Sequence, residues 1–337
     1  MLDKVKSIYI LKKIFEKIKN KRKLNIIKYN KRIIVKLNIN KEDFEIYITL
    51  KELNNKYNTN IKDLDIKELN LGARQIENEG LKVLVKIKFK ELNKLNLSGN
   101  KISDINILEK INYKELKKLN LNGNDIYDIN IFEKVDFKEL KELYLGYNRI
   151  SNINILEKVN FKELKKLNLN GNNIYDINIL EKVDFKELNI LDLNGNDIYD
   201  ISVLEKVDFK ELKELYLGYN RISDINILKK VNFKELIELD LSHNNISDIT
   251  ILEKVNFKEL IKLDLSNNKI SDINILEKVN FKKLKGLYLN NNYKITDINI
   301  LGKVNFKELN DLNLSYNKIS DINILEKADF KELKKDA

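Results

Sequence analysis

The sequence predicts an α/β solenoid, in which short units stack side by side around a curved parallel β-sheet. Three observations predict this fold class. The chain of 337 residues repeats one pattern in register over most of its length, as from Glu91 to Glu115 to Glu139, and one asparagine column and one phenylalanine column run through the repeats. In addition, no unit of this size can bury its own apolar face. Each unit therefore has to pack against its neighbours.

The repeat begins at Glu91 and follows the pattern E-L-x-x-L-x-L-x-x-N-x-I-x-D-I-x-x-L-x-K-x-x-F-K. Ten units span residues 91–331, and the ninth has one extra residue just after Asn292. A degenerate unit at 65–90 precedes them, and a stub at 332–337 follows. We therefore expect two domains, a basic helical N-terminal module at 1–60 and a repeat domain at 61–337.

Each unit contains one expected strand. Leu95 and Leu97 alternate with the polar Asn96, which is the periodicity of a β-strand. One short strand per unit predicts a parallel sheet, with the third, fourth, sixth, eighth and ninth positions of each unit facing outward. In a curved array these positions line the concave face.

The apolar spacing changes after the strand. Ile105, Leu108 and Ile111 lie three positions apart, as on one face of a helix, and Asp104 stands where a helix cap is expected. This pattern predicts about two turns of α-helix or 3₁₀ helix on the convex side of each unit.

Two columns are interpreted as structural. Asparagine occupies the tenth position of all ten units. A buried asparagine amide can satisfy backbone groups of its own turn and of the next unit, which an apolar side chain cannot do. Phenylalanine fills the twenty-third position of most units and is expected to form a buried spine on the convex side. The asparagines are Asn100, Asn124, Asn148, Asn172, Asn196, Asn220, Asn244, Asn268, Asn292 and Asn317.

The run L-x-x-L-x-L-x-x-N-x-I, as in Leu92, Leu95, Leu97, Asn100 and Ile102, resembles a leucine-rich repeat (LRR). The continuation I-x-D-I-x-x-L is most similar to the short intracellular and internalin-like LRR subclasses. The degenerate unit is more similar to the ribonuclease-inhibitor subclass. The resemblance covers residues 65–331. It implies a horseshoe with a concave parallel sheet and a protein that binds other proteins.

The concave positions supply the candidate partner-binding residues. Lys118 and Lys166 make the N-terminal half of this face basic, whereas Asp192, Asp240 and Asp264 make the following part acidic. Tyrosine is a common anchor of protein interfaces because it combines a large apolar ring with a polar tip. The candidate tyrosines are Tyr144, Tyr216 and Tyr288 at the sixth position of their units, and Tyr147, Tyr219 and Tyr316 at the ninth.

Other interpretations of this face stay open. Lysine and glutamate can simply solvate a sheet. The sixth-position tyrosines are three units apart, as expected if a block of three units was duplicated together with its tyrosines. A duplicated binding residue would also raise avidity. His243 lies on the same face and is interpreted as a polar surface residue.

The N-terminal module carries the net charge of the chain. Residues 1–60 hold 16 lysines and arginines against six acidic residues, and the remainder holds 46 of each sign. Apolar residues at helical spacing predict short helices from Ser7 to about Leu37. Thr49 and Glu52 form a possible capping box, which predicts a helix over 50–57.

Residues 7–37 also resemble an F-box, the small helical module that docks on the adaptor subunit of cullin-type ubiquitin ligases. The Leu-Pro opening that is usual for this family is replaced by Ser7-Ile8. The alternatives are a plain N-terminal cap, or a basic amphipathic segment that contacts a membrane or nucleic acid. The residues that carry the resemblance, and that would dock on the adaptor, are Leu11, Ile14, Phe15, Ile18, Leu24 and Ile27.

Composition excludes several chemistries. The chain has no cysteine and a single histidine, so disulfides, thiolate metal sites and histidine-based catalytic sets are not expected. No glycine-rich phosphate loop or metal-ligand spacing occurs, and the repeated aspartates are explained as helix caps. We therefore expect no enzyme, no metal site and no cofactor.

The expected function is a non-enzymatic scaffold for protein–protein interactions, with a protein partner bound on the concave face. The first hypothesis is an F-box-type substrate adaptor of a ubiquitin ligase. The alternative is a standalone LRR regulatory scaffold, similar to phosphatase regulators or to internalins. Lysines interrupt every long apolar run, and no cysteine-stapled caps are possible, so we expect a cytoplasmic protein. Nucleic-acid and membrane partners are not expected.

Overall fold

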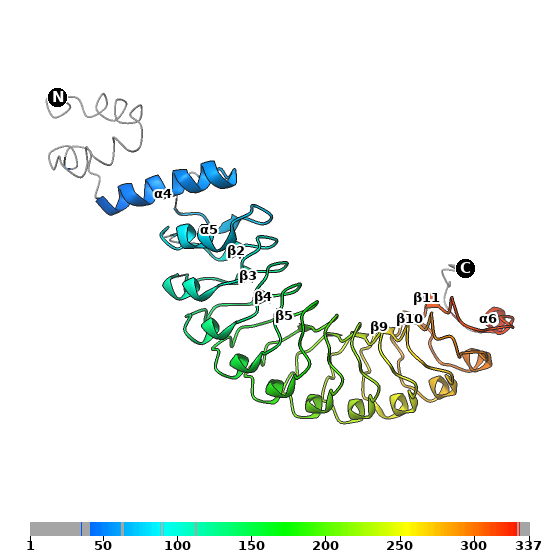
Figure 1. The fold of residues 1–337 in the computed structure, drawn as a ribbon. Helices are drawn as coiled ribbons and strands as arrows, with labels where there is room; N and C mark the ends of the chain where they lie inside the picture. The colour runs from blue at the N-terminus through cyan, green and yellow to red at the C-terminus, as the bar shows by residue number, and fades with distance from the viewer. Residues whose placement is uncertain are drawn as a thin grey trace.

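The computed structural model describes residues 41–328, apart from positions 62, 63, 88, 90 and 112, together with Val35 and Phe330. Within these residues the chain forms one open sheet of 11 parallel strands in sequential order. Figure 1 shows the units stacked along an arc, with the strands on its inner side and the short helices along its outer side. The α/β solenoid predicted from the repeats is confirmed.

Every strand has three residues and occupies the fourth to sixth positions of its unit. The middle leucine points into the core, and the two flanking residues face the concave side. Each residue pairs with the residue at the same position of the next unit, as Leu191 does with Leu215. The strands are β1 (Glu68–Asn70), β2 (Lys94–Asn96), β3 (Lys118–Asn120), β4 (Glu142–Tyr144), β5 (Lys166–Asn168), β6 (Ile190–Asp192), β7 (Glu214–Tyr216), β8 (Glu238–Asp240), β9 (Lys262–Asp264), β10 (Gly286–Tyr288) and β11 (Asp311–Asn313).

The convex side is shorter than predicted, because four or five residues of 3₁₀ helix replace the expected two turns. A 3₁₀ helix rises about 2.0 Å per residue against about 1.5 Å in an α-helix, so it covers the return path with fewer residues. The 3₁₀ helices are η2 (Asn106–Lys110), η3 (Asn130–Glu133), η4 (Asn154–Glu157), η5 (Asn178–Glu181), η6 (Ser202–Glu205), η7 (Asn226–Lys229), η8 (Thr250–Lys254), η9 (Asn274–Glu277) and η10 (Asn299–Gly302). Helices α5 (Glu77–Leu84) and α6 (Ile324–Lys327) replace them in the degenerate unit and in the last unit.

Stacked apolar side chains fill the space between the sheet and the convex helices. The strand leucines and the isoleucines of the turn are almost fully buried, and so is the aromatic column, in which Phe209 is 1% exposed. Tyr113 takes the place of phenylalanine in the first full unit, and its buried hydroxyl donates a hydrogen bond of 3.2 Å to the Ile87 carbonyl. The apolar core is therefore one continuous column along the whole array.

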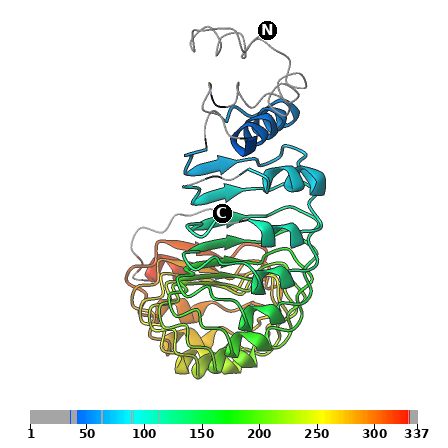
Figure 2. The same ribbon diagram turned by 90° about the vertical axis from the view of Figure 1, so that its left-hand side faces the viewer.

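The main described element of the N-terminal module is helix α4 (Lys41–Tyr57). It lies over the first strands at the end of the stack (Figure 2), and its Leu53 and Tyr57 belong to the same core as the repeat leucines. The prediction of a helix beginning at residue 50 is wrong. Thr49 lies inside α4, where its hydroxyl donates to the Glu45 carbonyl at 2.8 Å instead of capping a new helix.

The other N-terminal predictions concern a part of the chain that the structure does not describe. Leu11, Ile14, Phe15, Ile18, Leu24 and Ile27, the F-box-like set, lie outside the described residues. Among the helices of the described part, none is both long enough and apolar enough to cross a membrane.

Candidate functional site: the concave face

The asparagine ladder fixes the turn that follows each strand. The Asn196 amide donates to the Leu193 carbonyl of its own turn at 3.0 Å and to the Leu169 carbonyl of the preceding unit at 3.1 Å. Its oxygen accepts from the backbone N–H of Ile174, also in the preceding unit, at 3.0 Å. The predicted bridge between units is therefore present, but it joins each asparagine to the preceding unit and not to the next. The reason is that the backbone groups that need a partner, such as the Leu169 carbonyl and the Ile174 N–H, belong to the turn of the preceding unit.

Asn317 is an exception in this ladder. Its amide nitrogen donates to the carbonyls of Leu289 and Leu314 at 2.9 and 2.8 Å, but its buried side-chain oxygen has no partner. The N–H that should reach it, that of Ile295, is bonded instead to the Asn292 carbonyl at 2.9 Å. The extra residue after Asn292 changes the turn and so breaks one step of the ladder.

On the concave face, Tyr144 is enclosed by charged neighbours from three strands. The ammonium groups of Lys118 and Lys166, on β3 and β5, lie 4.8 and 5.4 Å from the centre of its ring. Its hydroxyl donates to Glu142 at 2.7 Å, and Lys118 pairs with the same carboxylate at 2.8 Å. Burial, followed by the adjacent carboxylate of Glu142, raises the pKa of the Tyr144 hydroxyl. The phenol therefore stays neutral and acts as a donor.

Tyr288 has a similar arrangement. The Lys262 ammonium lies 5.5 Å from the centre of its ring, and this lysine pairs with Glu238 at 2.7 Å. The Tyr288 hydroxyl donates to the carboxylate of Asp311. Burial and this carboxylate raise the pKa of the hydroxyl well above its usual range. Both tyrosines are thus already in contact with a lysine of this chain.

Tyr216 is the third tyrosine of the set and has different neighbours. Its hydroxyl donates to Glu214 at 2.8 Å. The fourth-position residues on the two adjacent strands are Ile190 and Glu238, so neither is a lysine. Burial, and then the carboxylates of Glu214 and Glu238, raise the pKa of the Tyr216 hydroxyl far above its usual value.

Three aspartates continue the sixth-position row beside Tyr216. Asp192 and Asp240 flank it directly, and Asp264 follows on β9. Burial raises the pKa of both Asp192 and Asp264, and the negative charge of Asp240 contributes in the same direction. The sheet therefore brings together acidic residues that the sequence places one or two units apart.

The ninth-position aromatics lie on the rim, one turn beyond the strand ends. Tyr147, Tyr219, His243 and Tyr316 all adopt left-handed backbone conformations, with φ between 51 and 55°. Four other units have glycine at this place, for example Gly171 with φ of 59°. A residue with a Cβ is held in this region at a cost of about 1–2 kcal/mol. The rings of Tyr219 and His243 stack with centres 3.7 Å apart. Burial lowers the pKa of His243.

Sequence reasoning missed four exposed tyrosines. In the described residues, every exposed tyrosine lies between the strand and the convex helix of its unit. Three of the missed ones occupy the thirteenth position, and reading that column of the repeat could have found them. The missed residues are Tyr127, Tyr175, Tyr199 and Tyr293.

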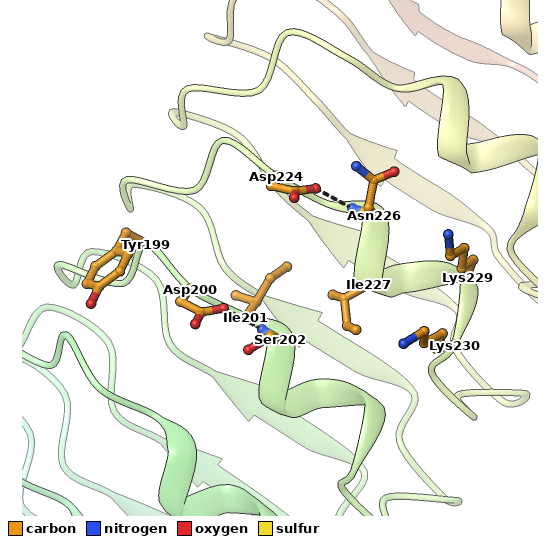
Figure 3. Close-up of a pocket in the computed structure, with 9 residues that line it drawn as sticks. All are labelled: Tyr199, Asp200, Ile201, Ser202, Asp224, Asn226, Ile227, Lys229 and Lys230. Carbon is orange, nitrogen blue, oxygen red and sulfur yellow. Dashed lines mark hydrogen bonds between the residues drawn. The ribbon is translucent and has the colours of Figure 1, made fainter.

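The convex side has a shallow hollow of about 460 Å³ between η6 and η7. Figure 3 shows that Asp200 and Asp224 both belong to it. Each accepts a 2.8 Å hydrogen bond from the first backbone N–H of a 3₁₀ helix. The predicted cap position is off by one residue, because the N-caps are Ile201 and Ile225, and each aspartate lies just before its N-cap and bonds the backbone two residues on. Across the described chain no three His, Asp or Glu side chains gather in a way that could hold a metal ion. The hollow is the ordinary groove between stacked units. Its lining is Tyr199, Asp200, Ile201, Ser202, Asp224, Asn226, Ile227, Lys229 and Lys230.

Comparisons with known proteins agree with this geometry. Residues 234–278 and 258–303 match a family model of two-copy leucine-rich repeats, and residues 92–105 match another leucine-rich-repeat model. No curated protein matches the sequence.

Several solved structures share the fold. An internalin (inlF) from Listeria monocytogenes is 24% identical, with a TM-score of 0.57 over 86% of this chain and 94% of that chain. A leucine-rich-repeat protein of Leptospira interrogans is 22% identical, with a TM-score of 0.58 over 84% and 80%. A plant peptide hormone receptor, in complex with the ligand RGF2, is 20% identical, with a TM-score of 0.52 over 70% and 37%. The chain therefore carries leucine-rich repeats and has the fold of a leucine-rich-repeat solenoid.

Proposed function

We propose that this protein is a non-enzymatic scaffold that binds a protein partner on its concave face. The observation that carries the proposal is that buried structural positions and outward-facing positions are separate within each unit. The strand leucines, the asparagine ladder and the aromatic column hold the array together. The fourth-position side chains take no part in these elements, and at the sixth position most asparagines and aspartates accept one backbone hydrogen bond from the turn, as Asp240 does from Ser242, whereas the tyrosines accept none. On that face, half-buried tyrosines lie among charged groups, a composition that favours protein recognition.

Similar structures support a binding role. The plant receptor that shares the fold is described in complex with RGF2, a ligand bound by that protein. A curved sheet also presents a long row of side chains held in fixed register, which suits an extended or convex partner.

The test uses the absence of cysteine in the chain. Lys213 and Lys229 are both exposed lysines of one unit, the first at a concave position and the second on η7 at the convex side. Lys213→Cys and Lys229→Cys are each labelled with a bulky maleimide polymer, immobilised, and compared in capturing proteins from an extract of the source cells. We expect the concave label to prevent capture of the partner and the convex label to leave it unchanged. Equal capture by both labelled proteins would contradict a concave binding site.

The adaptor role is a more specific hypothesis within this proposal. It predicts that the full chain retains the adaptor subunit of a cullin ligase and that Ile14→Asp with Phe15→Asp abolishes this without affecting concave binding. Retention by the doubly substituted chain would leave the standalone scaffold, with the N-terminal module as a cap. The cytoplasmic location expected from the sequence belongs to the same proposal, and immunofluorescence of the tagged chain tests it.

A further inference from the structure

Charge is balanced differently on the two faces of the array. On the convex side, a lysine of one unit pairs with a glutamate of the unit before, as Lys206 does with Glu181 at 3.0 Å and Lys230 with Glu205 at 2.7 Å. Around Tyr216 on the concave face this compensation is incomplete, since Lys262 pairs there with Glu238 alone, at 2.7 Å. The carboxylates there that form no ion pair with any described lysine or arginine are those of Asp192, Glu214, Asp240 and Asp264.

The three sixth-position tyrosines provide an internal comparison, because they occupy equivalent places three units apart. At Tyr144 the flanking fourth-position residues are both lysines, and both ammonium groups lie over the ring. At Tyr288 the preceding strand supplies Lys262 in the same way. At Tyr216 the corresponding residues are Ile190 and Glu238. Tyr216 donates to Glu214 as Tyr144 donates to Glu142, yet among the described residues no lysine or arginine lies over the Tyr216 ring.

We propose that the patch formed by Tyr216 and the surrounding carboxylates of Asp192, Glu214, Asp240 and Asp264, beside the Glu238–Lys262 pair, binds a lysine side chain from a basic segment of the protein partner. This inference rests on the proposed function and specifies its partner chemistry. The ammonium would lie over the Tyr216 ring and beside Glu214, as Lys118 lies over Tyr144 and beside Glu142. The attraction of a cation to an aromatic face adds to the ion pair.

Two local features hold the carboxylates of the patch in place. Gly218, two positions after Tyr216, lies against Asp240 and Ser242, since a Cβ at Gly218 would come within 3.0 Å of both side chains. The absence of a side chain at Gly218 makes room for the Asp240 carboxylate and the Ser242 hydroxyl, which occupy the space that a Cβ would take. In addition, Asp192 and Asp240 receive hydrogen bonds only from neutral amide groups, which orient the carboxylates without cancelling their charge. Burial raises the pKa of Asp192 and the charge of Asp240 adds to this, while Lys166 partly offsets it, so a further cation would stabilise the ionised carboxylates.

A metal ion is the competing occupant, and the geometry favours lysine. Neighbouring strands are about 4.8 Å apart, and oxygen ligands must come within about 2.6 Å of a calcium ion. No three carboxylates of the described chain meet that requirement. A lysine ammonium needs only one or two oxygen partners and an aromatic face, which is what the patch offers.

The test uses a fluorescein-labelled decapeptide of alternating glycine and lysine, and the same peptide with every lysine Nε-acetylated. Binding to the full chain is measured by fluorescence anisotropy between 50 and 500 mM NaCl, with and without 1 mM CaCl₂. We expect one lysine peptide per chain, at least tenfold weaker binding of the acetylated peptide, and no effect of calcium. Equal binding of both peptides, or displacement by calcium at constant ionic strength, would overturn the proposal.

Two double substitutions convert one tyrosine site into another. Each introduces residues that other units already have at the fourth position. Ile190→Lys with Glu238→Lys gives Tyr216 the lysines that flank Tyr144, and we expect at least a tenfold loss of affinity. Lys118→Ile with Lys166→Glu does the reverse at Tyr144, and we expect a second peptide to bind per chain. Tyr216→Phe should bind within twofold of the original chain, whereas Tyr216→Asn should bind at least threefold more weakly.

A charge-matched control separates the site from general electrostatics. Glu109→Lys with Asn130→Lys adds the same charge on the convex helices η2 and η3, and we expect binding to change less than threefold. If this control weakens binding as much as the concave pair, the patch is not a specific site.

If the concave maleimide label stops capture of a partner while Ile190→Lys with Glu238→Lys does not, the proposed function stands and the lysine site is wrong. If the purified chain self-associates at low salt and its N-terminal basic region displaces the peptide, the occupant is a second copy, and the partner assignment is overturned.

Discussion

At the scale of single residues, the same side chain has different consequences according to its position in the repeating unit. An asparagine at the tenth position forms a bridge between units, whereas an asparagine on the convex helices is only solvated. A tyrosine at the sixth position is half-buried among charges, and one at the ninth is an exposed ring on a strained backbone. Position in the unit, and not residue type alone, therefore decides which substitutions are costly.

Asn196→Ala should lower the free energy of unfolding by about 1–3 kcal/mol, because it leaves the Leu169 and Leu193 carbonyls and the Ile174 N–H without their partner. Urea denaturation followed by circular dichroism measures this. Asn178→Ala on η5 is the control and should stay within about 0.5 kcal/mol of the original chain. Equal effects of the two substitutions would contradict the ladder.

Phe209→Ala should cost about 3–5 kcal/mol, because it opens a cavity in the aromatic column where the side chain is 1% exposed. Tyr199→Ala removes an equally large ring that is 63% exposed and should change stability by about 0.5 kcal/mol or less. Thermal melts of both variants provide the comparison. A mild effect at Phe209 would mean that the column does not hold adjacent units together.

Asp264→Asn should stabilise the protein at pH 7, by up to about 1 kcal/mol. The pKa of Asp264 is raised above its usual 3.8 by burial, so the folded state disfavours the ionised carboxylate. This cost is present above the raised pKa and disappears as the pH falls through it towards 3.8. The advantage of the variant should therefore shrink between pH 7 and pH 4.

Asp248→Asn is the matched control for this titration and should have the opposite sign. Its hydrogen bonds with Thr250 lower the pKa of Asp248 from its usual 3.8, so its carboxylate stabilises the fold above pH 3.8 and that contribution is lost on acidification. Urea midpoints measured for both variants at several pH values test the pair. Parallel pH profiles for the two variants would contradict the assigned shifts.

At the scale of elements, each unit is a strand, a tight turn, a short 3₁₀ helix and an extended return. The hydrogen-bond register of the sheet tolerates one irregular turn, since β10 and β11 still pair residue by residue after the longer ninth unit. The turn itself does not tolerate it, because the buried oxygen of Asn317 is left without a partner. Sheet pairing and turn geometry are thus separate constraints on unit length.

Deleting Tyr293 gives the ninth unit the same length as the others and should stabilise the array by about 1 kcal/mol or more. The deletion lets the Ile295 N–H reach Asn317, as Ile270 N–H reaches Asn292 at 3.0 Å. Chemical denaturation measures the gain. Deleting Asn173 from the regular fourth unit is the control, and it should destabilise the protein because it removes a residue from an intact turn.

At the scale of the whole molecule, stability is a sum of unit and interface terms, because each unit contacts mainly its two neighbours. The central strands have a fully buried middle leucine, as in β6. All three residues of β11 are instead partly exposed. The array is therefore least protected at β11 within the described residues.

Hydrogen exchange followed by mass spectrometry should show this gradient. Backbone amides of β11 and α6 should exchange at least tenfold faster than those of β6 and β7, since the residues of β11 are partly exposed and the middle leucines of β6 and β7 are fully buried. Uniform exchange along the array would mean that it unfolds as a single cooperative unit.

The sequence by itself determined the solenoid, its repeat length, its strands and the alternation of buried and outward-facing strand positions. These features follow from local periodicity, which is repeated in every unit. An ambiguous assignment in one unit can therefore be resolved by comparison with the others. The start of α4 could not be found in this way, because Thr49 and Glu52 match a cap that packing of Leu53 against the first unit overrides. The length of the convex helices and the direction of the asparagine bridges also depended on how units stack.

Only the tertiary structure decided which concave charges are already compensated. Tyr144, Tyr216 and Tyr288 are equivalent in the sequence repeat, yet their neighbours come from adjacent strands, a whole unit away along the chain. The stacking places lysines over two of these rings and carboxylates around the third. Electrostatic complementarity depends on distances across strands and not along the chain, which is why the open lysine site at Tyr216 becomes visible only when the units are assembled.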